Sequence, residues 1–133
     1  MRLAVSMGDP AGVGAELCVK AALEPEFAGV DFRFYGSQSV LGEAFRRWGG
    51  GVPAPQAAFD GGLKFGDFAV GQADARCGKT AYDALTAAVE DVKKGDCAAL
   101  VTAPMNKYSV NLAGIPFTGH TERIAEQIGR AHV

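Results

Sequence analysis

Three short apolar runs, each followed by a turn and a helical pattern, are the feature that most constrains this chain. The runs cover residues 3–7, 32–35 and 97–101. Continuous hydrophobicity over so few residues is typical of strands that are buried on both faces of a sheet. Because these strands alternate with helices, the sequence predicts a mainly parallel sheet covered on both sides, which is a three-layer α/β/α architecture.

Capping residues and apolar spacing set the expected helices. Asp9 is a candidate N-cap and Pro10 a candidate first residue for a helix that ends near Leu23. Ser37 or Ser39 can cap a second helix, in which Leu41, Phe45 and Trp48 are expected to form one apolar stripe. Further helices are expected at residues 80–94, 106–113 and 121–130.

Residues 52–74 interrupt this pattern, because prolines and glycines break every candidate element there. Short strands are expected near residues 57–59 and 68–70. The chain contains no internal repeat, low-complexity tract or linker. We therefore expect residues 1–133 to form a single α/β unit.

Composition excludes several classes of protein. The net charge of −2 gives no basic surface for nucleic acid or for an anionic membrane. No run approaches the roughly 20 apolar residues of a membrane span, and the N-terminus lacks the apolar run of a signal peptide. Cys18, Cys77 and Cys97 are widely spaced and are expected to be buried or half-buried thiols in a reducing compartment. These features favour a cytoplasmic protein.

Two turns are candidate binding segments, because ligands of open α/β sheets gather at the carboxyl ends of the strands. Residues 8–14 could present backbone N–H groups to an anion, although GDPAGVG lacks the GxGxxG spacing of dinucleotide sites. A purely structural turn explains this segment equally well. In residues 102–107, Lys107 opens a helix with the wrong sign for the helix dipole. A bound anion and a solvated lysine are both consistent with that position.

The segment Gly119–Glu122 places His120 just before an expected helix N-terminus. The helix dipole favours a neutral imidazole there, and such a ring can donate or accept a hydrogen bond to a substrate hydroxyl or phosphate. The alternative is that Thr121 caps the helix and that His120 has no role.

Two other kinds of site are disfavoured by spacing. Gly78-Lys79-Thr80 resembles the end of a phosphate-binding P-loop, but the glycine required five residues earlier is Ala73. The chain has two histidines and no paired Cys/His spacing. No metal site can therefore be assembled from this chain by itself.

Three motifs together resemble the 4-hydroxythreonine-4-phosphate dehydrogenase family, whose members act in vitamin B6 biosynthesis. The motifs are SMGDPAGVG at residues 6–14, VTAPMNK at 101–107 and AGIPFTGHTE at 113–122. Their order and spacing match across the chain, with Gly78 expected to open the long helix. One departure is Ala15, where the family usually has proline, and this difference affects only the start of a helix.

The resemblance implies a fold like that of isopropylmalate dehydrogenase, with residues 1–133 as an incomplete, N-terminal part of a two-domain enzyme. It implies NAD(P)-dependent oxidation of the 3-hydroxyl of 4-phosphooxy-threonine, followed by decarboxylation to 3-amino-2-oxopropyl phosphate. A divalent metal ion would polarise that hydroxyl and stabilise the enolate. Family members are homodimers with active sites near the subunit interface.

The resemblance also assigns residues. His120 and Thr121 match the family's substrate-binding pair, and Asp9 and Lys107 lie in motifs that line the same cleft. The family's three metal-binding histidines are expected beyond residue 133, so the isolated chain is expected to be inactive. It is also expected to be marginally stable or to associate, because missing strands would leave an open sheet edge.

Two alternatives stay open. One is a related dehydrogenase acting on another phosphorylated hydroxy acid or on a dihydrodiol. The other is a small, non-catalytic, anion-binding α/β module.

Overall fold

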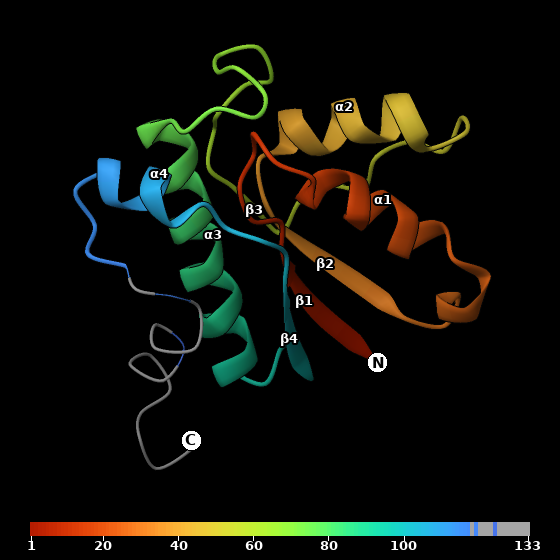
Figure 1. Cartoon of the computed structure of the whole chain (residues 1–133). Helices are drawn as coiled ribbons and strands as arrows, with labels where there is room; N and C mark the ends of the chain where they lie inside the picture. Colours follow the sequence, from red (N-terminus) through yellow and green to blue (C-terminus); the bar gives the residue numbers. More distant parts are fainter. Residues whose placement is uncertain (118, 120–123, 125–133) are drawn as a thin grey trace.

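A four-stranded, fully parallel sheet forms the middle layer of the computed structural model, which describes residues 1–117, 119 and 124 (Figure 1). The strand order is β3-β2-β1-β4, so β1 lies in the interior of the sheet. In the register of the sheet, Val5 of β1 lies opposite Phe34 of β2 and Val101 of β4. The strands are β1 (Arg2–Ser6), β2 (Asp31–Gly36), β3 (Phe59–Asp60) and β4 (Ala99–Thr102).

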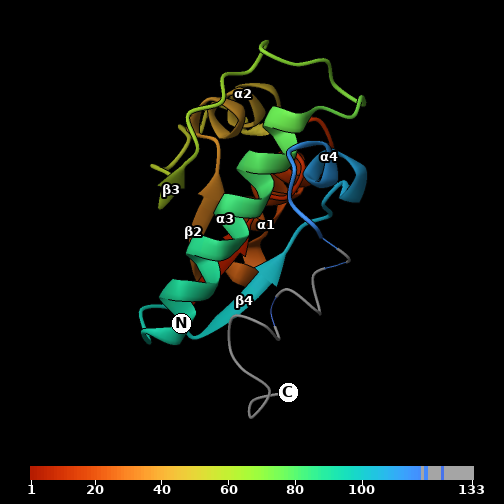
Figure 2. The same cartoon turned by 90° about the vertical axis from the view of Figure 1, so that its left-hand side faces the viewer.

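Helices cover both faces of this sheet, which confirms the predicted three layers (Figures 1 and 2). On one face, α1 and α2 pack on Val5, Met7 and Phe34. On the other face, α3 packs on Ala4 and Tyr35, and α4 packs in turn against α3. The helices are α1 (Gly14–Leu23), α2 (Gln38–Trp48), α3 (Ala75–Lys93) and α4 (Lys107–Leu112), with a short 3-10 helix at Pro25–Phe27.

The first helix begins later than the sequence predicts. α1 begins at Gly14, and Asp9 is not its N-cap, since Val13 occupies that position. The Asp9 carboxylate instead accepts a hydrogen bond from the backbone N–H of Ala11 at 3.0 Å. An aspartate side chain readily closes such a local turn, and this turn competes with the helix for residues 10–13.

The long helix begins earlier than predicted. α3 begins at Ala75, because the Asp74 side chain caps it by accepting from the N–H of Arg76 at 2.8 Å. Gly78 therefore lies inside the helix and does not open it. It is a close-packing position, since a Cβ there would lie 2.1 Å from the carbonyl oxygen of Ser109 in α4.

The second helix follows its predicted cap but not its predicted stripe. Ser37 caps α2 by accepting from the N–H of Val40 at 3.2 Å. Leu41 and Phe45 are buried, whereas Trp48 is 44% exposed. Trp48 is the last residue of α2 and borders a surface hollow, so the apolar stripe ends one turn before it. The strand expected at residues 68–70 is irregular, with a bend and a turn. Apart from Ile124, the helix expected at 121–130 lies outside the described residues.

In the described part of the chain, the four-residue strand β4 lies at one edge of the sheet. β4 pairs with β1, and no other described strand pairs with its far side. Val101 in this strand is 46% exposed. The open edge predicted from the sequence is therefore present within the described residues. Cys18, Cys77 and Cys97 are free, buried thiols. None of the described helices is both long and apolar enough to cross a membrane.

We predict that Gly78→Ala destabilises the chain by about 2 kcal/mol, because the new methyl group overlaps the α4 backbone. Gly42→Ala in α2 is the matched control, since a Cβ there meets nothing within 4 Å. Alanine at that position should stabilise the helix by roughly 0.5–1 kcal/mol. Urea denaturation of both variants measures the difference. Equal effects of the two substitutions would show that Gly78 has no special packing role.

Candidate functional site

The two turns singled out in the sequence meet at the carboxyl edge of the sheet. The N–H of Asp9 donates to the carbonyl of Pro104 at 2.9 Å, and the N–H of Ala103 donates to the carbonyl of Ser6 at 2.9 Å. Because β1 and β4 are parallel neighbours, the turns that follow them leave the sheet side by side (Figure 1). The structure therefore brings residues 8–14 and 103–107 together, as the sequence predicted.

Glycine is required where these turns touch. Gly8 has a φ of 74°, and a Cβ on it would lie 2.2 Å from the carbonyl oxygen of Pro104. A Cβ on Gly14 would lie 1.7 Å from the carbonyl oxygen of Met7. A side chain on Gly8 would push the two turns apart, whereas one on Gly14 would collide with the backbone just after β1. The glycines therefore act in close backbone packing.

The start of α3 and the start of α4 complete this edge. The N–H of Asp74 donates to the Ser109 hydroxyl at 3.0 Å, and the N–H of Ser109 donates to the Asn106 side chain at 3.1 Å. Ser109 is fully buried between the two helices. Neither Asp74 nor Ser109 was among the site residues predicted from the sequence. Asp74 could have been found as an N-cap, whereas the contact of Ser109 depends on how two distant helices pack.

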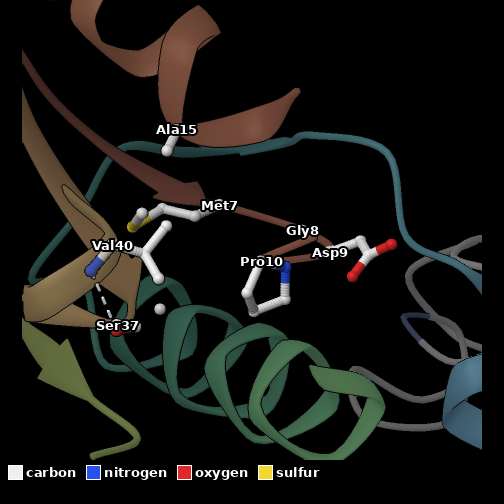
Figure 3. Close-up of a pocket in the computed structure, with 8 residues that line it drawn as sticks. Met7, Gly8, Asp9, Pro10, Ala15, Ser37 and Val40 are labelled. Carbon is white, nitrogen blue, oxygen red and sulfur yellow. Dashed lines mark hydrogen bonds between the residues drawn. The ribbon is translucent and has the colours of Figure 1, made fainter. Parts of the chain in front are cut away.

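Asp9 is a half-buried carboxyl group at this edge. Burial raises its pKa, the hydrogen bond from Ala11 lowers it, and the charge of Asp74 raises it again, so the net pKa lies above its ordinary value. In Figure 3 the Asp9 carboxylate points away from Met7 and Val40. It can accept hydrogen bonds from a ligand and, when protonated, donate one.

Cys77, by contrast, is not a candidate nucleophile. Its side chain is fully buried. Burial, followed by the charges of Asp9 and Asp74, raises the pKa of the Cys77 thiol to about 12. The thiol is therefore neutral near pH 7, and the thiolate that would act as a nucleophile is absent.

The small hollow in Figure 3 is a packing feature. It is lined mainly by apolar groups from the turn after β1 and from α1 and α2, including Met7, Ala15 and Val40. Ser37 at its border already donates to the carbonyl of Leu63 and accepts from Val40. Because it has no room for a ligand, this hollow is not a candidate site.

The other predicted site residues lie beside this edge or outside the described residues. Lys107 is the exposed first residue of α4 and forms no hydrogen bond or ion pair with the described residues. It is therefore available to an anion in solvent. His120 and Thr121 lie outside the described residues, so their substrate-binding role stays a prediction.

The chain just before His120 is firmly packed. The N–H of Phe117 donates to the Asn111 side chain at 3.1 Å, and the Phe117 ring meets Tyr82 edge-to-face at 6.2 Å. Phe117 is 5% exposed and packs in a cluster with Leu85 of α3. The third motif is thus anchored to α3 and α4 as far as Phe117.

Within residues 1–117, 119 and 124, no three His, Cys, Asp or Glu side chains lie close enough to hold a metal ion. The described residues therefore do not provide the ligand set of a divalent metal ion.

Comparison with known proteins gives a consistent result. A family model described as pyridoxal phosphate biosynthetic protein PdxA matches residues 31–133. A protein of Bradyrhizobium diazoefficiens, provisionally named D-threonate 4-phosphate dehydrogenase, is 38% identical over 96% of this chain and 41% of its own length. The 4-hydroxythreonine-4-phosphate dehydrogenase of Synechococcus sp. (strain JA-2-3B'a(2-13)) is 34% identical over 94% of this chain and 39% of its own.

A solved structure extends this agreement to the fold. The crystal structure of 4-hydroxythreonine-4-phosphate dehydrogenase from Burkholderia phymatum matches with a TM-score of 0.82 and 31% identity. The match covers 95% of this chain and 43% of that one, which confirms the predicted α/β fold and its incompleteness relative to the neighbour. The chain spans about two fifths of the length of the curated relatives it matches. It belongs to the family of the pyridoxal phosphate biosynthetic protein PdxA.

Proposed function

We propose that this chain is the N-terminal portion of an NAD(P)- and divalent-metal-dependent dehydrogenase of pyridoxal phosphate biosynthesis. The complete enzyme would oxidise the 3-hydroxyl of 4-phosphooxy-threonine and release carbon dioxide, giving 3-amino-2-oxopropyl phosphate. Membership in the PdxA family carries this proposal. The relatives named 4-hydroxythreonine-4-phosphate dehydrogenase support the substrate. We further propose that the complete enzyme is a cytoplasmic homodimer.

The proposal gives four residues of this chain a role in holding substrate. His120 and Thr121 bind it, while Asp9 and Lys107 line the same cleft. The contact between Asp9 and Pro104 supports this grouping, because it joins the turns that carry Asp9 and Lys107. The charges are also complementary, since Lys107 can attract the phosphate and Asp9 the ammonium group of the substrate.

The described residues provide no recognisable binding site for the metal ion or for the nucleotide. No described cluster supplies a ligand set for the metal ion, so we propose that its ligands follow residue 133. The turn at residues 8–14 lacks the glycine spacing of a dinucleotide site. We therefore assign to this chain only the binding and orientation of substrate.

A second candidate substrate is D-threonate 4-phosphate, because a relative provisionally named for it is 38% identical to this chain. The two compounds differ at carbon 2, which carries an ammonium group in 4-phosphooxy-threonine and a hydroxyl in D-threonate 4-phosphate. The carboxylate of Asp9 favours the cation over the neutral hydroxyl. This difference in charge is our reason for ranking 4-phosphooxy-threonine first.

The binding role of His120 is tested by NMR titration of the 133-residue chain with 4-phosphooxy-threonine and, separately, with D-threonate 4-phosphate. We expect the imidazole signals of His120 to shift with substrate, because its ring nitrogens bind the ligand. His132 is the internal control and should not shift. Equal shifts at both histidines, or none at His120, would contradict the assignment.

We predict that the 133-residue chain alone does not reduce NAD or NADP in the presence of 4-phosphooxy-threonine and a divalent metal ion. The physical reason is that the described residues provide no metal-binding cluster. The absorbance of the reduced nicotinamide measures how much NADH or NADPH is formed. Metal-dependent reduction by the purified chain would overturn the view that this segment only holds substrate. If the chain binds substrate and no longer version of it is catalytic, the alternative of a small, non-catalytic, anion-binding module would be supported instead.

Asp9→Asn separates binding from stability. Because the pKa of Asp9 is raised, its ionised form opposes folding at neutral pH. This penalty decreases as pH falls through the raised pKa and is gone below the ordinary pKa of an aspartate. The variant should therefore melt at an equal or higher temperature than the parent at pH 7. Its affinity for 4-phosphooxy-threonine should fall about tenfold, because a charged hydrogen bond is lost.

Asp31→Asn is the control for this experiment. The hydrogen bond from Arg2 lowers the pKa of Asp31, so the ionised form of Asp31 favours folding at neutral pH. Asp31→Asn should lower the melting temperature at pH 7 and leave substrate affinity unchanged. An Asp9→Asn variant that loses stability but keeps its affinity would refute the binding role of Asp9.

A further inference from the structure

A second hollow, which we call the β3–α3 hollow, lies where the loop after β3 meets α3. Its volume is about 290 Å³. This is near the lower limit of pockets that hold small molecules. The candidate-site residues Asp9 and Lys107 do not border it. Its described lining consists of Gly61, Gly62, Leu63, Asp67, Arg76, Lys79, Thr80 and Asp83.

One face of α3 presents hydrogen-bond donors to this hollow. Arg76, Lys79 and Thr80 are spaced three and four residues apart, so they lie on the same side of the helix. The Lys79 ammonium donates to Asp83 at 2.8 Å, which leaves two of its three N–H groups without a partner among the described residues. Arg76 donates through Nε and one Nη to Asp74 and to the carbonyl of Asp67. Its other Nη forms no hydrogen bond within the described part of the chain.

The hydroxyl of Thr80 is the third donor that borders the hollow. The residue is only 6% exposed, and its hydroxyl makes no hydrogen bond to the described residues, yet this hydroxyl is not a buried, unsatisfied group. The hydroxyl therefore meets solvent at the hollow that Thr80 lines, where an acceptor on a bound ligand could take the place of water. Gly61 keeps the approach open, because a Cβ on it would lie 3.2 Å from the Thr80 hydroxyl oxygen.

The hollow also contains acceptors, which restricts the kind of ligand that fits. The carboxylates of Asp67 and Asp83 border it together with the two cations, so the lining is neutral overall. A bare anion would satisfy Lys79 and Thr80 but would also face both carboxylates. A ligand that adds hydroxyl groups to its anionic group would give these carboxylates hydrogen bonds to accept.

We propose that the β3–α3 hollow binds a small phosphate ester that carries free hydroxyl groups. The phosphate would accept hydrogen bonds from Lys79, Arg76 and Thr80, and the hydroxyls would donate to Asp67 and Asp83. This inference does not rest on the dehydrogenase activity proposed above. It also gives Lys79 and Thr80 a phosphate-binding role without the loop geometry of a P-loop, which this chain lacks.

The test is an NMR titration of the ¹⁵N-labelled, 133-residue chain with glycerol 3-phosphate. We expect saturable shifts of the Gly61, Gly62 and Thr80 amides with this probe, weaker binding of inorganic phosphate and no binding of glycerol. Equal affinities for glycerol 3-phosphate and inorganic phosphate would overturn the role of the hydroxyl groups. Shifts confined to residues near Gly119 would place the ligand at the proposed substrate site and overturn the β3–α3 hollow as a binding site.

Matched variants on the same helix test the individual donors. Thr80→Val preserves shape and removes the hydroxyl, and Lys79→Gln removes the charge. Each should weaken the binding of glycerol 3-phosphate about tenfold, because a hydrogen bond to a charged group is lost. Thr86→Val and Lys93→Gln are the controls and should leave the affinity unchanged, since neither residue borders the hollow. Unchanged affinity in Thr80→Val would refute the proposal.

Discussion

The parallel pairing of β1 with β4 is the constraint on which the candidate site depends. These strands are far apart in the sequence, yet their register sets the turns that follow them against each other. The backbone hydrogen bond from the N–H of Asp9 to the carbonyl of Pro104 then connects the two turns. Gly8 makes this approach possible, because any Cβ there would collide with the Pro104 carbonyl. The glycines of the SMGDPAGVG motif at residues 6–14 are thus required for close backbone packing at Gly8 and Gly14.

α3 is the second organising element, because it contacts both the sheet and α4. Small residues such as Ala84 and Ala88 let it lie close to the strands, and Gly78 lets α4 approach from the other side. Ser109 ties the two helices by accepting from the N–H of Asp74. The same helix anchors Phe117, which leads the chain toward His120. Packing on α3 therefore positions the third motif as far as Phe117.

The carboxyl edge of the sheet carries two groups of polar residues with different surroundings. Near β1 and β4, backbone contacts are tight and Asp9 is half-buried, so its pKa responds to burial and to Asp74. Beside β3, glycines leave an open hollow in which Thr80 has an unused hydroxyl. Each place combines positively charged donors with a carboxylate, and this combination is the basis of the two ligand proposals made above.

The sequence by itself determined the strand–helix alternation, the three layers and the cap of α2 by Ser37, because these follow from local apolar spacing and capping chemistry. It also determined the family, since three short motifs occur in order. The starts of α1 at Gly14 and of α3 at Ala75 depend on local hydrogen bonds of two aspartates. Asp9 accepts from the N–H of Ala11 in a turn that precedes α1, and Asp74 accepts from the N–H of Arg76 and so caps α3.

Only the tertiary structure decided which distant residues meet. It showed that Gly8 touches Pro104, that Gly78 touches Ser109 and that Thr80 borders a hollow. No periodicity encodes these contacts, because they depend on strand order and on the packing of helices that are remote in the sequence.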